Sequence, residues 1–283
     1  MNTGLKLKMH DKIKEALLED ITYKDASVEG IFDEESIATA DLIAKEDGVL
    51  CGVEVFEEVF KILDKDSDFK FNKKEGEILT KGELIATVKS KAQEMLLAER
   101  TALNFLQRMS GIATATKKMV ETLGDRSIQL ADTRKTAPGL RIFDKYSVMV
   151  GGGSNHRFNL SDTVMLKDNH ISGAGGIKSA VEKVRQNNSF TTKIEVEAEN
   201  IEQVKEAIES KCDIIMLDNM SEKEIDKSIE LIDSRAMIEV SGNISIDSIS
   251  KYRGKKIDII SCGELTHSVK VLDISLKNMK IEG

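Results

Sequence analysis

The chain of 283 residues is acidic, with 41 Lys and Arg against 49 Asp and Glu, and it contains no Lys/Arg-rich run. This balance excludes nucleic acid as the main partner, because phosphate backbones are held by concentrated positive charge. No apolar stretch approaches the roughly 20 residues that a membrane helix needs, and no secretory apolar core follows the N-terminus. The three cysteines are widely spaced without a metal-binding pattern, which predicts reduced, buried thiols in a cytoplasmic protein.

The first third of the chain combines helical and strand patterns. Apolar residues at helical spacing predict a helix over residues 12–19 and a strongly amphipathic helix over Val53–Leu63. Residues 38–50 alternate like a strand that leads into a turn, and two short strands, FKFN and ELIATVKS, follow the second helix. The pattern over residues 92–123 is helical, with an expected break at Ser110-Gly111. This part of the chain is therefore expected to be α+β.

The rest of the chain repeats one unit, an apolar, β-rich run that ends in a polar residue or a glycine. Helical stretches such as IEQVKEAIESK and KEIDKSIELI separate most of these runs. The repeat is typical of βα units, and near-continuous apolar strands indicate a parallel sheet that is buried on both faces. The six runs are SIQLADTRK, TVMLKDNH, KIEVEAEN, DIIMLDNM, MIEVSGN and DIISCGE.

Both an open doubly wound sheet and a closed barrel fit this repeat. Functional groups gather at one switch point in an open sheet, whereas in a barrel they come from the carboxyl ends of many strands. Nearly every run here ends in a candidate, so the pattern predicts a barrel. The candidates are Arg134 and Lys135, Lys167, Glu197, Asp218, Ser241-Gly242 and Gly263.

A cationic cluster surrounds the triple glycine Gly151-Gly152-Gly153. Local positive charge in an acidic chain indicates a compact anionic ligand rather than a polyanion. Guanidinium forks and ammonium groups suit carboxylates and phosphates, and His156 lies directly between the glycine-rich loop and an arginine. The cluster consists of Arg134, Lys135, Arg141, Lys145, His156, Arg157, Lys167 and His170.

Residues at the ends of five of these strands indicate more specific chemistry. The small residues of EVSGNIS and ISCGEL follow the last two strands, where barrels commonly hold a phosphate through backbone N–H groups. Glu197 and Asp218 end adjacent strands, and two carboxylates there suit ribose hydroxyls or Mg²⁺. Periodicity does not separate Glu197 from Glu195 and Glu199. Lys167 offers an amine for a Schiff base, but its charged surroundings argue against the desolvation that would lower the pKa of that amine.

Eight segments of the chain match one known family in order, and the match extends from about residue 50 to residue 276. The segments are AERTALNFLQRMSGIAT, DTRKTAPGLR, KYSVMVGGGSNHR, LKDNH, EVEAEN, IIMLDN, EVSGNI and CGELTHSVKVLDISL. They resemble the quinolinate phosphoribosyltransferase family (nicotinate-nucleotide pyrophosphorylase, carboxylating), one of the type II phosphoribosyltransferases. The segment ITYKDASVEGIF and the residue Glu264, where the family commonly has alanine, depart from its pattern.

The resemblance implies a fold, a reaction and partners. The fold is an incomplete, TIM-like α/β barrel over residues 111–269, with an N-terminal α/β sandwich domain over residues 1–110 that the segment 270–283 rejoins. The reaction converts quinolinate and phosphoribosyl pyrophosphate to nicotinate mononucleotide, pyrophosphate and CO₂, with Mg²⁺, in de novo NAD biosynthesis. The expected enzyme is a cytoplasmic homodimer or dimer-based hexamer with no nucleic-acid or membrane partner.

The resemblance also implies a role for each matching residue. The expected catalytic residues are Lys135, Lys167, Glu197 and Asp218, of which Glu197 and Asp218 contact ribose hydroxyls or the metal. Arg134, Lys135, His156 and Arg157 bind the carboxylates of quinolinate, Lys167 lies between quinolinate and pyrophosphate, and Arg100 reaches the site of a neighbouring subunit. The remaining substrate-binding residues are Thr133 and, around the 5′-phosphate, Ser241, Gly242, Asn243, Ser261 and Gly263.

Four other functions compete with this one. A paralogous phosphoribosyltransferase, such as the molybdenum-operon member of the family, uses another acid, but LKDNH and NHR favour quinolinate. Nicotinate phosphoribosyltransferase has one carboxylate fewer to bind, so this number of cations exceeds its need. A lyase or aldolase with a Schiff base at Lys167 is the third alternative. The fourth is a non-catalytic metabolite-binding barrel, against which the full set of charged candidates argues.

Overall fold

The computed structural model describes residues 3–28 and 30–282, and it divides into two compact units. The first unit comprises Met1–Lys117, Thr136–Gly152 and Thr266–Gly283. The second comprises Lys118–Lys135 and Gly153–Leu265. The domain limits expected from the sequence, 1–110 with 270–283 and 111–269, remain predictions about independently folding domains.

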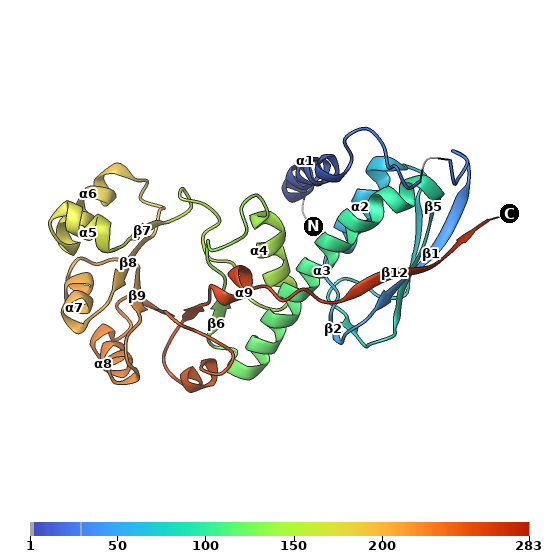
Figure 1. Ribbon diagram of the computed structural model, residues 1–283. Coiled ribbons are helices and arrows are strands. Elements are labelled where there is room, and N and C mark those ends of the chain that lie inside the picture. Colours follow the sequence, from blue (N-terminus) through green and yellow to red (C-terminus); the bar gives the residue numbers. More distant parts are fainter. Residues whose placement is uncertain (1–2, 29, 283) are drawn as a thin grey trace. The chain divides into compact units, whose positions relative to one another are not determined.

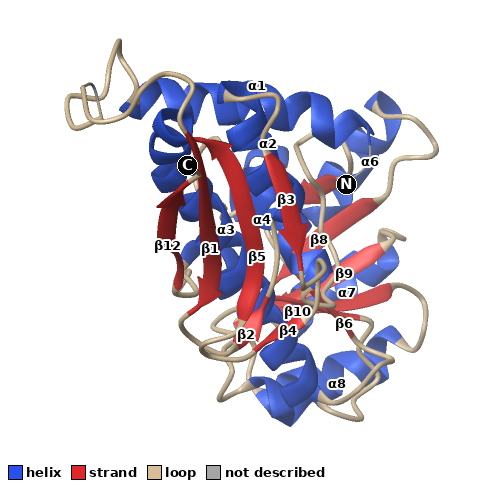
Figure 2. Cartoon of the chain, turned by 90° about the vertical axis from the view of Figure 1, so that its right-hand side faces the viewer, coloured by secondary structure: helices blue, strands red, loops and turns tan. Residues whose placement is uncertain are grey.

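A four-stranded antiparallel sheet forms the first unit, with the strands in the order β12-β1-β5-β3 (Figures 1 and 2). Buried residues alternate along β1, as expected for a strand with one face toward a core. A separate pair, β2 (Gly48–Val49) and β4 (Ile78–Leu79), lies outside this sheet. The strands of the sheet are β1 (Ile37–Ala44), β3 (Asp68–Phe71), β5 (Leu84–Lys91) and β12 (Ile274–Ile281).

Helix α2 (Val53–Leu63) has the bounds that its apolar spacing predicts, and it packs on the sheet through aromatic rings. The ring centroids of Phe56 and Phe60 lie 6.2 and 5.6 Å from that of Phe69 on β3. The carboxylate of Glu75 accepts hydrogen bonds from the first backbone N–H groups of the helix. The other helices of this unit are α1 (Thr3–Asp20), α4 (Arg141–Val150) and the first part of α3 (Ala92–Leu123).

The expected break at Ser110-Gly111 is wrong, because α3 continues unbroken through both residues. Ser110 accepts a hydrogen bond from the backbone N–H of Cys51 and donates one to its carbonyl. A Cβ atom on Gly111 would lie 2.2 Å from the carbonyl oxygen of Lys270. These small residues therefore let other backbone segments approach the helix closely, and they do not interrupt it.

Six parallel strands form the second unit in the order β6-β11-β10-β9-β8-β7, which agrees with the expected barrel-like sheet. All six apolar runs form strands, and helices follow most of them (Figure 1). The strands are β6 (Gln129–Ala131), β7 (Val164–Leu166), β8 (Ile194–Ala198), β9 (Ile214–Asp218), β10 (Met237–Ser241) and β11 (Ile259–Ser261). The helices are α5 (Asp168–Ala174), α6 (Ile177–Asn187), α7 (Ile201–Glu209), α8 (Glu222–Ile232), the 3₁₀ turn η1 (Ile249–Tyr252) and the short α9 (Glu264–His267).

The strand register decides which side chains share a face of this sheet. Glu197 pairs with Met216, which in turn pairs with Glu239, so these three lie in one row. Side chains two residues apart in a strand point to the same face, which extends the row to neighbouring positions. The polar residues on this face are Glu195, Glu197, Asp218, Glu239 and Ser241.

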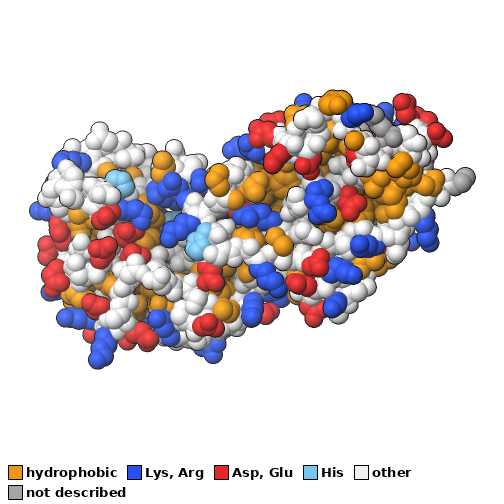
Figure 3. All heavy atoms as spheres, viewed as in Figure 1, with side chains coloured by type: hydrophobic (Ala, Val, Ile, Leu, Met, Phe, Trp, Pro, Cys, Tyr) orange, Lys and Arg blue, Asp and Glu red, His pale blue; other side chains and the backbone are white. Residues whose placement is uncertain are grey.

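On the face drawn in Figure 3, the outer surface of the second unit shows no large area of side chains with one sign of charge. Acidic and basic side chains are interspersed over α5 to α8. No helix in the described ranges is both long enough and apolar enough to cross a membrane.

Candidate active site

The residues after β6 bring two cations to the carboxyl end of the sheet. Arg134 is half-buried there, and Lys135 is exposed. The Thr133 hydroxyl accepts the backbone N–H of Lys135 at 3.0 Å and so fixes the turn between the two cations. The turn holds a guanidinium and an ammonium group beside each other at the end of one strand.

The loop with His156 and Arg157 is anchored beside this turn by a buried carboxylate. Asp132, which is fully buried, accepts the backbone N–H of His156 at 2.9 Å and the side-chain amide of Asn155 at 2.6 Å. Ser154 bridges to Ala131, so the loop continues the sheet beyond β6. Two segments that are about 20 residues apart therefore form one surface.

Arg157 has uncharged partners and a cation nearby. Its guanidinium donates to the carbonyl of Thr163 at 3.1 Å and to the sulfur of Met165 at 3.5 Å. Burial, and then the charge of Arg134, lower the pKa of Arg157 from its usual value, although a guanidinium stays charged at neutral pH. Two arginines held close together in a partly buried place are suited to binding an anion.

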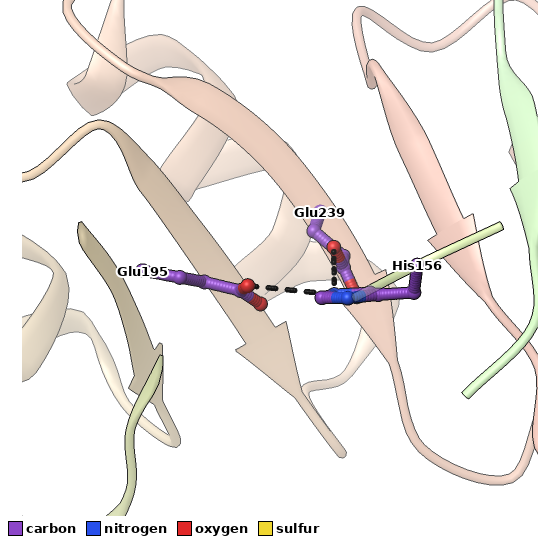
Figure 4. A group of neighbouring side chains, drawn as sticks. All are labelled: His156, Glu195 and Glu239. Carbon is purple, nitrogen blue, oxygen red and sulfur yellow. Dashed lines mark ion pairs between the residues drawn. The ribbon is translucent and has the colours of Figure 1, made fainter. Parts of the chain in front are cut away.

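Beneath these cations, His156 lies between two buried glutamates (Figure 4). Its Nε2 atom is 3.4 Å from Glu195 of β8 and 3.2 Å from Glu239 of β10, and both carboxylates are fully buried. Burial, opposed by the contact with His156 and reinforced by the charge of Glu239, raises the pKa of Glu195. Desolvation and a like charge therefore act together against the charged form of Glu195.

Lys167 and Glu197 meet at the ends of β7 and β8. The ammonium group forms an ion pair with Glu197, whose side chain is 11% exposed while that of Lys167 is 43% exposed. The amine is therefore partly exposed to solvent and is paired with a carboxylate. On the next strand, Asp218 is half-buried and accepts the amide of Asn219 at 2.7 Å.

Small residues at the ends of β10 and β11 leave backbone and hydroxyl groups available. Gly242 has φ +97°, and a Cβ atom there would lie 2.3 Å from the amide oxygen of Asn219, so glycine is required. Asn243 donates to the same oxygen at 3.0 Å. The hydroxyl of Ser261 is buried and has no hydrogen-bond partner in the described part of the chain. A buried hydroxyl without a partner beside these turns fits a ligand oxygen such as that of a phosphate.

Two other expected site residues, Gly263 and Arg100, lie outside the contacts described above. Gly263 precedes α9, and Glu264, the unusual residue of this turn, is exposed at the first position of that helix. Arg100 is exposed on α3 in the first unit, and its expected role in the site of a neighbouring subunit remains a prediction.

Sequence reasoning missed the anchoring role of Asp132 and the burial of Glu195 and Glu239. The signal for the glutamates was present, because an acidic residue flanked by apolar neighbours occurs inside both IEV and IEVS. Charged residues are almost never fully buried unless they have a partner. Their partner comes from a distant loop, which periodicity along one strand does not reveal.

Two groups of side chains contain carboxylates that could bind a metal ion. Glu197 and Asp218 supply the oxygen ligands that Mg²⁺ prefers, at strand ends where substrate oxygens can complete the coordination. His156, Glu195 and Glu239 also bring possible ligand atoms within 4.8 Å of one another. However, Nδ1 of His156 accepts the backbone N–H of Arg157 at 2.7 Å, so the ring proton belongs on Nε2, where a metal would have to bind. The second set therefore does not offer Nε2 to a metal, and binding of Mg²⁺ by the first set stays a prediction.

Comparisons with protein families agree with this geometry. Residues 20–110 match the N-terminal domain of quinolinate phosphoribosyl transferase, and residues 112–277 match its C-terminal domain. The chain belongs to the quinolinate phosphoribosyltransferase family. The expected enzyme class, a decarboxylating phosphoribosyltransferase, is thereby confirmed.

Individual relatives span nearly the whole chain. A probable nicotinate-nucleotide pyrophosphorylase (carboxylating) of Bacillus subtilis is 42% identical over 95% of this chain and 93% of its own length. The crystal structure of NadC from Streptococcus pyogenes has a TM-score of 0.95 at 46% identity and covers 98% of both chains. The nicotinate-nucleotide pyrophosphorylase of Francisella tularensis has a TM-score of 0.90 at 36% identity, over 97% of this chain and 96% of its own. The expected fold, an incomplete barrel with an N-terminal α+β domain, is confirmed.

Proposed function

We propose that this quinolinate phosphoribosyltransferase carries out its reaction at the carboxyl ends of the six parallel strands, where separate groups hold the two substrates. One observation supports this most directly. The register aligns Glu197, Asp218 and Ser241 on one face of the sheet, and Lys167 joins them through its ion pair with Glu197. Functional side chains from several strand ends are the usual arrangement of a barrel enzyme.

Quinolinate binds at the cationic end of this row. Arg134, Lys135 and Arg157 provide positive charge for the two carboxylates, and the hydrogen-bond acceptors of the Arg157 guanidinium, Thr163 and Met165, are uncharged. Guanidinium groups bind carboxylates in a bidentate manner, which orients the flat pyridine ring as well as holding it. Thr133 and the backbone of the same turn define the edge of this subsite.

Phosphoribosyl pyrophosphate binds along the remaining strand ends. Ser241, Gly242 and Asn243, with Ser261 and Gly263, surround the 5′-phosphate, for which the buried Ser261 hydroxyl is an available donor. Glu197 and Asp218 face the ribose hydroxyls. Lys167, between the two subsites, faces the pyrophosphate, and its ion pair with Glu197 exchanges for a contact with the substrate.

The chemistry requires little beyond positioning and charge. The pyridine nitrogen attacks C1 of the ribose while the bond to pyrophosphate breaks, which develops oxocarbenium character that the carboxylates stabilise. Lys167 and Lys135 offset the charge of the departing pyrophosphate. The ribosylated nitrogen is positive, so the C2 carboxylate leaves as CO₂, and a proton takes its place on the resulting ylide. Holding two reactants in line is worth up to about 7–11 kcal/mol.

Mg²⁺ and a second subunit complete the proposal. Mg²⁺ would be held by Glu197 and Asp218 together with substrate oxygens, and it would supply charge neutralisation for the pyrophosphate. Arg100, exposed on α3, would contribute to the quinolinate subsite of another copy of the chain in a homodimer or a dimer-based hexamer.

The test is a Mg²⁺-dependent assay of the full chain with phosphoribosyl pyrophosphate and either quinolinate or nicotinate. Mononucleotide and CO₂ are measured together. We expect turnover with quinolinate alone and one CO₂ for each mononucleotide. Turnover of nicotinate without CO₂ would contradict the need for two carboxylates. Absence of product with both acids, or an adduct trapped at Lys167 by borohydride, would overturn the assignment in favour of a paralogue, a binding protein or a lyase.

A further inference from the structure

Glu195 and Glu239 have no assigned role in the reaction. The two glutamates lie on β8 and β10, on either side of β9, and Figure 4 shows them directed at one imidazole ring. Both carboxylates are fully buried, and within the described ranges each forms its one ion pair with His156. The ring is therefore held by charge from two strands at once.

Burial of these two carboxylates lowers the stability of the folded chain. Apart from the contacts with Nε2 of His156, none of the four carboxylate oxygens has a hydrogen-bond partner within the described residues, and burial of a carboxylate costs several kcal/mol unless it is well paired. Apolar side chains, as on the intervening Ile214 and Met216, would fill such positions at lower cost. Costly local choices of this kind are expected mainly where function requires them.

The two nitrogens of His156 serve different neighbours within the chain. Nδ1 accepts the backbone N–H of Arg157 at 2.7 Å, and Nε2 faces the two carboxylates. A nitrogen that accepts an N–H carries no proton, so the ring proton is on Nε2. Both nitrogens therefore contact protein groups.

The ring instead connects the buried carboxylates to Arg157. The backbone of Arg157 is fixed by His156, and its guanidinium is fixed by Thr163 and Met165. A bidentate contact with a carboxylate tolerates little misplacement of the guanidinium, since displacement of about 1 Å can cost a hundredfold in rate. A support that locks the backbone under the arginine is thus directly relevant to substrate binding.

We propose that Glu195 and Glu239 are positioning residues, which hold His156 by its Nε2–H so that His156 holds Arg157 in place for a quinolinate carboxylate. The expected contact of His156 itself with a quinolinate carboxylate stays a separate prediction. The proposal builds on the proposed function, because it assigns the subsite of Arg157 to quinolinate. It predicts a defect confined to one of the two substrates.

The experiment compares Glu239→Leu and Glu239→Gln with the exposed control Glu230→Gln in the full enzyme. For Glu239→Leu we expect the KM for quinolinate to rise about tenfold or more, with the KM for phosphoribosyl pyrophosphate changed less than about twofold. Gln keeps an acceptor for Nε2–H and should restore most of the affinity. Equal changes in both KM values, or a loss of thermal stability with both KM values unchanged, would show a purely structural role and overturn the proposal.

Nitrogen NMR of histidine-labelled protein provides a readout that does not depend on turnover. In the wild type we expect His156 to have a protonated Nε2 and an unprotonated Nδ1, and Glu239→Leu should alter this signal. A wild-type ring with its proton on Nδ1 alone would overturn the proposal. Failure of the proposed function would appear differently, as a wild-type enzyme that neither binds nor converts quinolinate while its His156 signal still reports the Nε2–H form.

Discussion

The carboxylate of Asp132 accepts the backbone N–H of His156 at 2.9 Å, which joins the end of β6 to the loop that carries His156 and Arg157. This contact brings the Arg134 turn and the Arg157 loop to the same edge of the sheet. The same carboxylate also accepts from Asn155, so a single buried side chain fixes the loop at two points. The cationic subsite therefore depends on an anion beneath it.

Asp132→Ala should destabilise the second unit and weaken quinolinate binding. The substitution leaves the N–H of His156 and the amide of Asn155 without their acceptor, at a cost of about 1–3 kcal/mol. Urea unfolding measures the first effect, and the KM for quinolinate measures the second. Unchanged values for both would show that the loop holds its position without Asp132.

Arg134→Ala should raise the KM for quinolinate by roughly one to two orders of magnitude while leaving the KM for phosphoribosyl pyrophosphate nearly unchanged. Loss of one charge-assisted, bidentate contact has an effect of this size. Arg126→Ala, at an exposed arginine of the same unit, removes the same charge and is the matched control. A normal KM for quinolinate in the Arg134 variant would refute the assignment.

Gly111→Ala should destabilise the protein although it places alanine inside a helix. The new methyl group would lie 2.2 Å from the carbonyl oxygen of Lys270, and forced overpacking of this kind typically costs roughly 1–3 kcal/mol. Gly173→Ala in α5, where nothing lies within 4 Å, should be neutral or slightly stabilising. Calorimetry of the two variants would distinguish close packing from helix propensity, and equal melting temperatures would contradict the expectation.

The three thiols should resist modification in the native protein. Cys51, Cys212 and Cys262 are buried, and burial raises the pKa of each, in the case of Cys212 to about 12. Only thiolates react rapidly with disulfide reagents, so labelling should require unfolding. Fast reaction of one cysteine at neutral pH would indicate local opening around it.

The spacing of apolar residues along the chain predicted helices and strands well where burial alone decides that spacing. The amphipathic spacing of Val53–Leu63 gave α2 its observed bounds, and each of the six apolar runs formed a strand, because burial on both faces requires nearly continuous apolar sequence. The same logic failed at Ser110-Gly111. Small residues permit a helix break and also permit close approach of another backbone, and only the tertiary contact with Lys270 distinguishes the two.

The sequence by itself determined the barrel-like repeat, the family and the charged residues at the strand ends, because the order of apolar and polar residues along a strand reflects burial directly. Periodicity left Glu195, Glu197 and Glu199 equivalent, and only the resemblance to the family favoured Glu197. Tertiary structure separated them: the β8–β9 register and the approach of two loops bury Glu195 beneath His156 and pair Glu197 with Lys167, while Glu199 is exposed after the strand. The position of a charge in the chain is a local property, whereas its partner and its dielectric surroundings depend on segments distant in sequence.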